Sequence, residues 1–217
     1  MSLKASLVLR LLAAGGLLVP APIFADTISS NLASASAGVE SATASNWLAA
    51  SFTTSSSATL GEVILSLADT TSRGGTATVS VYADDGLNEP GSLLAALSSG
   101  STLQTWISSG LSLSANSTYW IVLSAVTGQV DWSYASDDAG SGSGFTDTWA
   151  ASYDGGSSWY TYASLQNVGV DPLQMDVETS TASTAATPEP ASVAFCLIGA
   201  GLAAMSWRRR TKQEKAK

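Results

Sequence analysis

The chain has 217 residues, no histidine and a single cysteine, Cys196, and its formal net charge is −8. A lone cysteine excludes an internal disulfide, and the lack of histidine removes the commonest general base and the commonest transition-metal ligand. Between residues 26 and 187 only Arg73 is basic against fifteen acidic residues, so this stretch carries a net charge near −14 and repels nucleic acid.

Residues 1–25 show the order of features that is typical of a secretory signal peptide. Two basic residues come first, an apolar run follows at residues 11–19, and prolines then end that run. The short apolar helix inserts into the membrane with its positive end in the cytoplasm. Ala25 is the expected cleavage position, with Ala21 as a second candidate. An ordinary buried N-terminal helix is the alternative interpretation.

Residues 27–178 predict one β-rich domain. Short runs of β-branched and aromatic residues recur between clusters of Gly, Ser, Asn and Asp, without a sustained helical period. The expected strands cover residues 60–67, 76–82, 119–126, 130–134, 149–153, 159–162 and 173–177. Residues 93–97 fit either a strand or a short helical turn. We therefore expect an all-β fold, an antiparallel β-sandwich of the jelly-roll kind, flanked by an N-terminal signal helix and a C-terminal transmembrane helix.

The alternation within these runs predicts which side chains face the core. In the first run Val63 and Leu65 share one side of the strand, and Ile64 lies opposite. The run at residues 119–126 is apolar almost throughout, which favours a central strand that is covered on both faces.

Several segments of the predicted domain at residues 27–178, which we call the body, share features with a known module. Residues 81–86 (VYADDG) end a strand in an Asp/Gly turn, and residues 90–95 (PGSLLA) return through a Pro-Gly-x-Leu segment. The sequence STYWIVL at 117–123 and a Trp-rich end at 149–162 agree with the same pattern. The body therefore resembles the choice-of-anchor R domain. This resemblance implies a surface or adhesion role without assigned catalysis.

Residues 152–159 (SYDGGSSW) fit the Asp-box pattern S-x-D-x-G-x-[ST]-W. In such a motif we expect Asp154 to accept backbone hydrogen bonds across a glycine-bearing hairpin turn, while Trp159 packs beneath the turn. The motif occurs once in this chain, whereas a β-propeller repeats such a unit blade by blade. We interpret it as a folding unit and not as a sign of a glycosidase.

Two acidic loops raise the question of a bound cation. One holds Asp84, Asp85 and Glu89, and the other holds Asp137, Asp138 and Asp147. Calcium takes about six to eight oxygen ligands, and neither loop has the spacing of the twelve-residue calcium loop. We expect no cofactor and interpret these carboxylates as solvated turn residues, with calcium left as the alternative.

Aromatic residues concentrate late in the body. They are Trp132, Tyr134, Trp149, Tyr153, Trp159, Tyr160 and Tyr162. Core packing is the default interpretation of such rings. Alternation places Trp159 and Tyr160 on opposite sides of a strand, so one of these sides should be core. A face that binds polysaccharide through exposed rings is the alternative.

The residues after the body fall into four parts. They are a flexible polar linker at 179–187, the tripeptide Pro188, Glu189 and Pro190, an uncharged segment at 191–207, and a basic tail at 208–217 that begins with Arg208, Arg209 and Arg210. As a helix the uncharged segment would measure roughly 25 Å, which is close to the minimum for a membrane span. The arginines would keep this end in the cytoplasm. A buried core helix is the alternative interpretation.

This order of features at residues 188–217 resembles the PEP-CTERM sorting signal. The resemblance implies cleavage near the tripeptide by an exosortase, a membrane cysteine protease. It also implies a Gram-negative-type bacterium that makes exopolysaccharide or biofilm matrix. Physically, the two prolines keep the backbone extended and outside a helix, which is the form a protease binds.

These features together predict an exported, non-enzymatic protein of the cell surface or the extracellular matrix. The expected partners are an exosortase, the inner membrane as a transient anchor, and extracellular polysaccharide. Two alternatives remain open. A carbohydrate-binding module requires several late aromatic rings to be exposed and coplanar, and a glycoside hydrolase requires two carboxylates about 5–10 Å apart in a cleft.

Overall fold

The computed structural model describes residues 25–68, 75–102, 104–162 and 171–180. These residues form antiparallel strands and contain no helix, which confirms the predicted all-β class. Consequently, no helix that is long and apolar enough to cross a membrane occurs in this part of the chain. The expected signal helix and transmembrane helix both lie outside the described residues.

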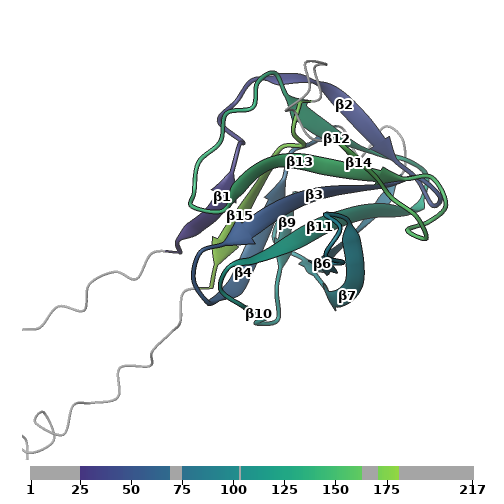
Figure 1. Cartoon of the computed structure of the whole chain (residues 1–217). Helices are drawn as coiled ribbons and strands as arrows, with labels where there is room; N and C mark the ends of the chain where they lie inside the picture. Colours follow the sequence, from purple (N-terminus) through teal and green to yellow (C-terminus); the bar gives the residue numbers. More distant parts are fainter. Residues whose placement is uncertain (1–24, 69–74, 103, 163–170, 181–217) are drawn as a thin grey trace, which may run out of the picture. The chain divides into compact units, whose positions relative to one another are not determined.

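One continuous sheet of six strands makes up the first layer, which we call the front sheet (Figure 1). In order across the sheet the strands are β14 (Tyr160–Tyr162), β13 (Phe145–Ser152), β3 (Trp47–Thr54), β11 (Ser117–Thr127), β6 (Thr76–Asp84) and β7 (Pro90–Ala96). Strand β11 pairs with β3 on one side and β6 on the other, so β14 and β7 form the two edges of the sheet.

The second layer is assembled from two groups of strands, which we call the back layer. The first group is β1 (Thr27–Ser30), β15 (Met175–Thr179), β4 (Ala58–Leu65), β9 (Thr105–Ile107) and β8 (Ser98–Ser99), with β10 (Ser112–Leu113) paired to β4. The second group is β2 (Ser36–Ala42), β12 (Val130–Ala135) and β5 (Leu67–Ala68). The groups are joined because Ser133 N–H donates to the Ser66 carbonyl and Gln174 N–H donates to that of Ser133, each at 2.8 Å.

A single large hydrophobic core joins the two layers. Its fully buried members include Ile121 and Leu123 from the front sheet, Val63 and Val177 from the first back group, and Trp132 from the second. Because both layers contribute to one core, the sheets pack in the manner of a β-sandwich. The jelly-roll order of the connections stays a prediction.

The strands with clear alternation formed as predicted. Val63 and Leu65 are fully buried in β4, while Ile64 between them is only partly buried. The apolar run at residues 119–126 lies inside β11, the predicted central strand. Residues 119–123 are apolar because both of their faces are covered: Ile121 contacts the main core, and Trp120 packs on the opposite face.

Other strand boundaries differ from the prediction. Residues 93–97, left open between strand and helical turn, belong to β7 up to Ala96. Strand β13 begins at Phe145 and ends at Ser152, so it starts earlier than expected and excludes Tyr153. The prediction also missed β1, β2, β3, β8, β9 and β10. Strand β3 (WLAASFTT) contains small residues of low intrinsic β propensity, and it is held by its neighbours on both sides.

Candidate functional site

The face of the front sheet that points away from the main core carries its own small apolar cluster. Its members, which we call the outer cluster, are Ala49, Trp120, Val122, Ala150 and Trp159, with Trp47 and Tyr82 packed against them. Trp159 belongs to the turn between β13 and β14 and is only 8 % exposed. The outer cluster therefore fastens this turn onto the sheet.

The predicted Asp box forms this turn, and its predicted geometry is confirmed. One carboxylate oxygen of Asp154 accepts hydrogen bonds from the backbone N–H groups of Ser157 (3.0 Å) and Ser158 (2.9 Å). Gly155 and Gly156 have positive φ angles of 73° and 87°, which favour glycine. A Cβ added to Gly156 would also lie 2.6 Å from the ring of Trp47. The sequence therefore fixes this turn in one conformation.

The hydrogen bonds around Asp154 stabilise its charged form. The hydroxyl and the backbone N–H of Ser158, the hydroxyl of Ser152 and the backbone N–H of Ser157 together lower the pKa of Asp154 to about 2, from a usual value of 3.8. Asp154 therefore remains a carboxylate at any neutral or mildly acidic pH. Its bonding positions are taken by the turn, which agrees with the interpretation of the Asp box as a folding unit.

A second turn, at residues 84–90, is tied to the same outer face. Trp120 of the outer cluster donates its indole N–H to Asp84 Oδ2 at 3.0 Å. Asp85 Oδ1 accepts backbone N–H groups from Leu87 (2.7 Å) and Glu89 (3.2 Å). The Thr161 hydroxyl of β14 donates to the Asn88 carbonyl at 3.0 Å, which joins this turn to the edge of the sheet at the Asp box.

Three of the six carboxylates considered for calcium accept backbone hydrogen bonds within their own turns. Asp84 Oδ1 accepts the N–H of Gly86 at 2.8 Å, Asp85 Oδ1 accepts that of Leu87 as described above, and Asp137 Oδ1 accepts that of Ala139 at 3.2 Å. Within the described ranges no three acidic side chains converge in the way that a metal site requires. Asp84, Asp85 and Asp137 therefore have a local structural role in the turns that carry them.

The late tryptophans are buried, whereas the late tyrosines are either exposed (Tyr153 and Tyr160) or partly buried against the main core (Tyr134 and Tyr162). Trp132, Trp149 and Trp159 are at most 9 % exposed, as the default interpretation predicts. Tyr153 and Tyr160 are 60 % and 57 % exposed, and they stand at the two ends of the Asp-box turn. Their ring centroids lie 5.8 Å apart with the ring planes tilted by 52°. Only these two rings have the exposure that a ligand needs among the late aromatics of the described chain.

A third tyrosine, Tyr162, lies next to this pair. The ring of Tyr162 stacks on Trp149, with centroids 4.4 Å apart and planes 21° from parallel. A side-chain hydrogen bond to Tyr153 is the largest cause of the raised pKa of Tyr162, followed by its burial and by the nearby charge of Glu40 on β2. We call Tyr153, Tyr160 and Tyr162 the tyrosine cluster. One member is anchored in the main core and two are open to solvent.

A row of carboxylates lies on the outer face of the back layer. Glu62 of β4 and Glu178 of β15 are directly opposed in the strand register, and Asp176 lies two residues before Glu178. Desolvation and the neighbouring like charges raise the pKa of Asp176 and of Glu178. Glu62 and Glu178 line a shallow hollow of about 310 Å³ that has no aromatic side chain among its described lining residues. It therefore lacks the ring that would hold a sugar against the two carboxylates.

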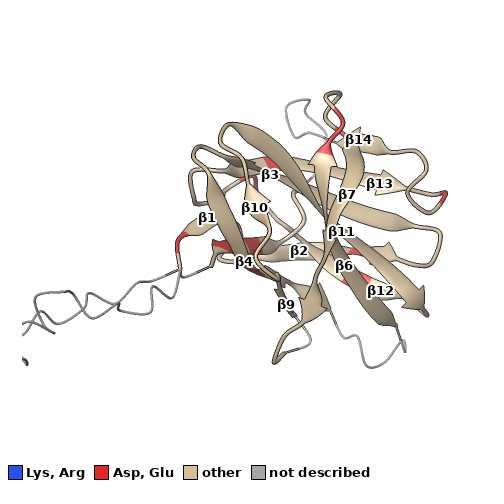
Figure 2. Cartoon of the chain, turned by 90° about the horizontal axis from the view of Figure 1, so that it is seen from below, with Lys and Arg blue, Asp and Glu red and all other residues tan. Residues whose placement is uncertain are grey.

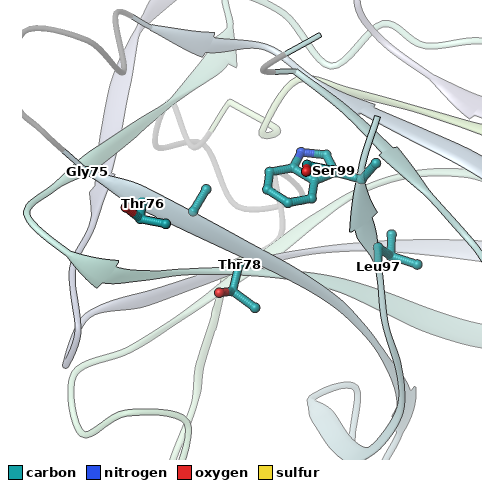
Figure 3. Close-up of a pocket in the computed structure, with 7 residues that line it drawn as sticks. Gly75, Thr76, Thr78, Leu97 and Ser99 are labelled. Carbon is teal, nitrogen blue, oxygen red and sulfur yellow. The ribbon is translucent and has the colours of Figure 1, made fainter. Parts of the chain in front are cut away.

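A cavity of about 470 Å³ opens beside β6 (Figure 3). Its lining residues are Gly75, Thr76, Ala77, Thr78, Leu97, Ser99 and Trp106. None of them is titratable, so the lining residues supply hydroxyl groups and apolar surface but no acid or base. The sequence interpretation did not single out this cavity or Trp106. A tryptophan between two β-branched residues, Thr105 and Ile107, was the only available signal.

The charged side chains of the described residues all have one sign. The described ranges contain no Lys or Arg, and the coloured residues of Figure 2 are accordingly all acidic. This distribution confirms the charge asymmetry that the sequence predicts, and it disfavours anionic ligands across the whole described body.

The residues predicted to direct sorting lie outside the described residues, apart from Ala25 at the start of the body. The undescribed set comprises Pro188, Glu189 and Pro190, the segment 191–207, and Arg208, Arg209 and Arg210. The described part of the body begins at Ala25 and ends at Ser180, and its two ends lie side by side. Asp26 N–H donates to Thr179 Oγ1, and Thr179 N–H donates to the Asp26 carbonyl, both at 2.9 Å.

Comparison with known proteins identifies one part of the chain. Residues 186–210 match the PEP-CTERM protein-sorting motif, and this range covers the tripeptide, the uncharged segment and the three arginines. The motif indicates an exported protein that an exosortase processes after transient anchoring in the membrane. No curated protein and no solved structure matches the chain. The resemblance of the body to the choice-of-anchor R domain stays a prediction.

Proposed function

We propose that the chain is a non-catalytic protein of the cell surface or the extracellular matrix of a Gram-negative-type bacterium. Residues 1–25 direct export, with cleavage after Ala25, and residues 191–207 hold the chain transiently in the inner membrane. The arginines at 208–210 keep the end of this segment in the cytoplasm. An exosortase then cuts near Pro188, Glu189 and Pro190 and releases a body related to the choice-of-anchor R domain.

The single observation that carries this proposal is the match of residues 186–210 to the PEP-CTERM protein-sorting motif. The acidic, lysine-free β body is consistent with it, because such a body is soluble outside the cell and is repelled by anionic lipid. Association with exopolysaccharide or biofilm matrix is part of the proposal. It is supported by the sorting motif and by the exposed tyrosines of the body.

Mass spectrometry of the mature protein tests the sorting step. The chain is expressed in a host with its exosortase and in a matched strain that lacks the enzyme. We expect the first strain to yield a protein that ends near residues 188–190, and the second to retain the full C-terminus in the membrane fraction. A mature mass that still includes residues 191–207 in the presence of the enzyme would show that the assignment is wrong.

Paired variants test whether the exosortase recognises the Pro-Glu-Pro tripeptide or only an exposed linker. The double variant Pro188→Ala/Pro190→Ala removes the two residues that hold the backbone extended, so we expect uncleaved protein to accumulate. The control Ser183→Ala/Thr184→Ala changes the adjacent linker and keeps the tripeptide. It should be processed normally. Equal processing of both variants would contradict a role for the tripeptide.

A further inference from the structure

The Asp-box turn presents two aromatic rings to solvent on a rigid base. Tyr153 leaves β13 and Tyr160 begins β14, so the turn between them sets their separation. Asp154 accepts hydrogen bonds from Ser157 and Ser158, and Trp159 is buried in the outer cluster. Because the turn is fixed at both points, a ligand would not have to order it on binding, which reduces the entropic cost of association.

The rings themselves indicate the chemistry of the ligand. A tyrosine has an apolar face that packs on apolar C–H groups and a hydroxyl that donates or accepts a hydrogen bond. A pyranose sugar has both features, an apolar ring face and a rim of hydroxyl groups. The rings of Tyr153 and Tyr160, with centroids 5.8 Å apart, are spaced to contact one sugar unit or two consecutive units.

Charge narrows the choice of sugar. The described body has no basic side chain, and the carboxylate of Glu40 lies close enough to raise the pKa of Tyr162. A polysaccharide with carboxylate or sulfate groups would be repelled by this surface. A neutral polysaccharide meets no such penalty, and its hydroxyl groups can donate hydrogen bonds to nearby carboxylates.

The tilt between the two rings narrows the choice of polysaccharide further. The planes of Tyr153 and Tyr160 meet at 52°, so the two rings form an angled pair, which we call the cradle, and not a flat platform. The coplanar rings that a flat sugar-binding surface requires are therefore absent from this pair. A bent cradle suits a chain that turns at each glycosidic linkage, whereas a flat ribbon of sugars would contact only one ring.

We propose that Tyr153 and Tyr160 form a binding site for a neutral polysaccharide whose chain turns at each linkage. Tyr162 lies beside this site in β14, where its ring stacks on Trp149 with centroids 4.4 Å apart. This inference rests on the proposed function for its biological meaning, since only a protein outside the cell meets such a polymer. The binding itself is a property of the folded body.

Isothermal titration calorimetry on the purified full chain, held in a detergent without sugar groups, tests the site. The probes are laminarihexaose and maltohexaose as neutral turning chains, cellohexaose as a flat neutral chain, and hexagalacturonate as an anionic chain. We expect at least one turning chain to bind more tightly than cellohexaose, and hexagalacturonate not to bind. Absence of binding by both turning chains overturns the proposal, as does equal or tighter binding of cellohexaose.

Matched variants assign the binding to the cradle. Tyr153→Ala and Tyr160→Ala should each weaken binding by about tenfold, whereas Tyr160→Phe should keep most of the affinity because it retains the ring. The control is Leu93→Ala on β7, the opposite edge of the same sheet, since Leu93 has the same 57 % exposure as Tyr160. Full affinity in the Tyr153→Ala/Tyr160→Ala double variant, or an equal loss in Leu93→Ala, overturns the assignment.

Circular dichroism of each variant confirms that the β fold is retained. The assay does not involve the sorting tail, so its result is independent of exosortase processing. A chain that is sorted but binds no neutral oligosaccharide would refute this inference alone. A chain that binds but is not sorted would refute the proposed route and leave the site intact.

Discussion

The main core and the outer cluster are both apolar, but they have different structural roles. The main core lies between the two layers and contains large aliphatic side chains that are fully buried, such as Ile121, Leu123 and Val63. The outer cluster lies on one face of one sheet and combines two tryptophans with small residues. The first cluster holds the fold together, whereas the second fixes two turns and the exposed tyrosines beside them.

This difference implies that the stability of the fold and the positioning of the turns beside the candidate site depend on partly separate sets of residues. Removing volume from the main core opens a cavity between two layers that cannot easily collapse. Removing a polar contact from the outer cluster releases a turn while the sheet beneath remains paired on both sides. Changes in the two places should therefore have unequal effects on unfolding. Three of the measurements below test this expectation, and a fourth tests the carboxylate row of the back layer.

The largest effect is expected from Leu123→Ala in the main core. Leu123 is fully buried, so the substitution should lower the free energy of unfolding by about 2–5 kcal/mol. Val126→Ala in the same strand is the control, because Val126 is 64 % exposed and its loss should change stability by less than about 0.5 kcal/mol. Urea denaturation measures both values. A Leu123→Ala cost as small as the control would contradict the role given to the core.

A smaller effect is expected from Trp120→Phe in the outer cluster. Phenylalanine keeps most of the apolar contact but loses the indole N–H that donates to Asp84. We expect destabilisation by about 1.5–3 kcal/mol, the range for a hydrogen bond to a charged group. Hydrogen exchange should show faster exchange in residues 84–90 than in β11. Uniform loss of protection across the sheet would contradict the separation of turn and fold.

A gain in stability is expected from Glu178→Gln on the outer face of the back layer. Glu178 faces Glu62 across the strand pair, and like charges in this position are destabilising. Removing one charge should raise the free energy of unfolding by about 0.2–1 kcal/mol at pH 7. Because the pKa of Glu178 is raised in the fold, the native state binds its proton more readily, so the advantage of the variant should shrink as the pH falls. Thermal unfolding of both proteins at pH 7 and pH 4 tests the gain in stability and its decrease with falling pH.

The smallest and most local effect concerns Asp154. Its pKa of about 2 lies below its usual value, so the charged form supports the turn above pH 4, and this support is lost as the pH falls toward 2. NMR should show the backbone N–H signals of Ser157 and Ser158 moving over this interval, with little change in the main core. The variant Asp154→Asn should show no such transition. A midpoint near pH 4 in the unaltered protein would contradict the hydrogen bonding described here.

The sequence predicted the parts of the fold in which local pattern and burial agree. The expected strand at residues 76–82, in which Val79 and Val81 are fully buried, and the apolar run in β11 both formed, because β-branched residues pack well on a pleated surface. Strand β3 was missed because its alanines and serine lack that preference, and its position is decided by β11 and β13 on either side. Such tertiary stabilisation leaves little trace in a local sequence pattern.

The candidate site was predictable to a similar degree. The Asp-box pattern gave the turn and the burial of Trp159, because its residues specify a local hydrogen-bond geometry. Alternation placed Trp159 and Tyr160 on opposite sides but could not tell which side was open. The exposure of Tyr160 follows from the position of β14 at the edge of the sheet, and that position depends on contacts far apart in the sequence.

The place of β15 in the back layer has a consequence for the order of events during secretion. This last strand lies between β1, the first strand, and β4, and it pairs with both. The layer therefore cannot close until the end of the body has been synthesised and has emerged on the far side of the membrane. In the proposed route of export, in which residues 1–25 lead the chain through the membrane, this layer stays open during passage and closes when residues 175–179 arrive.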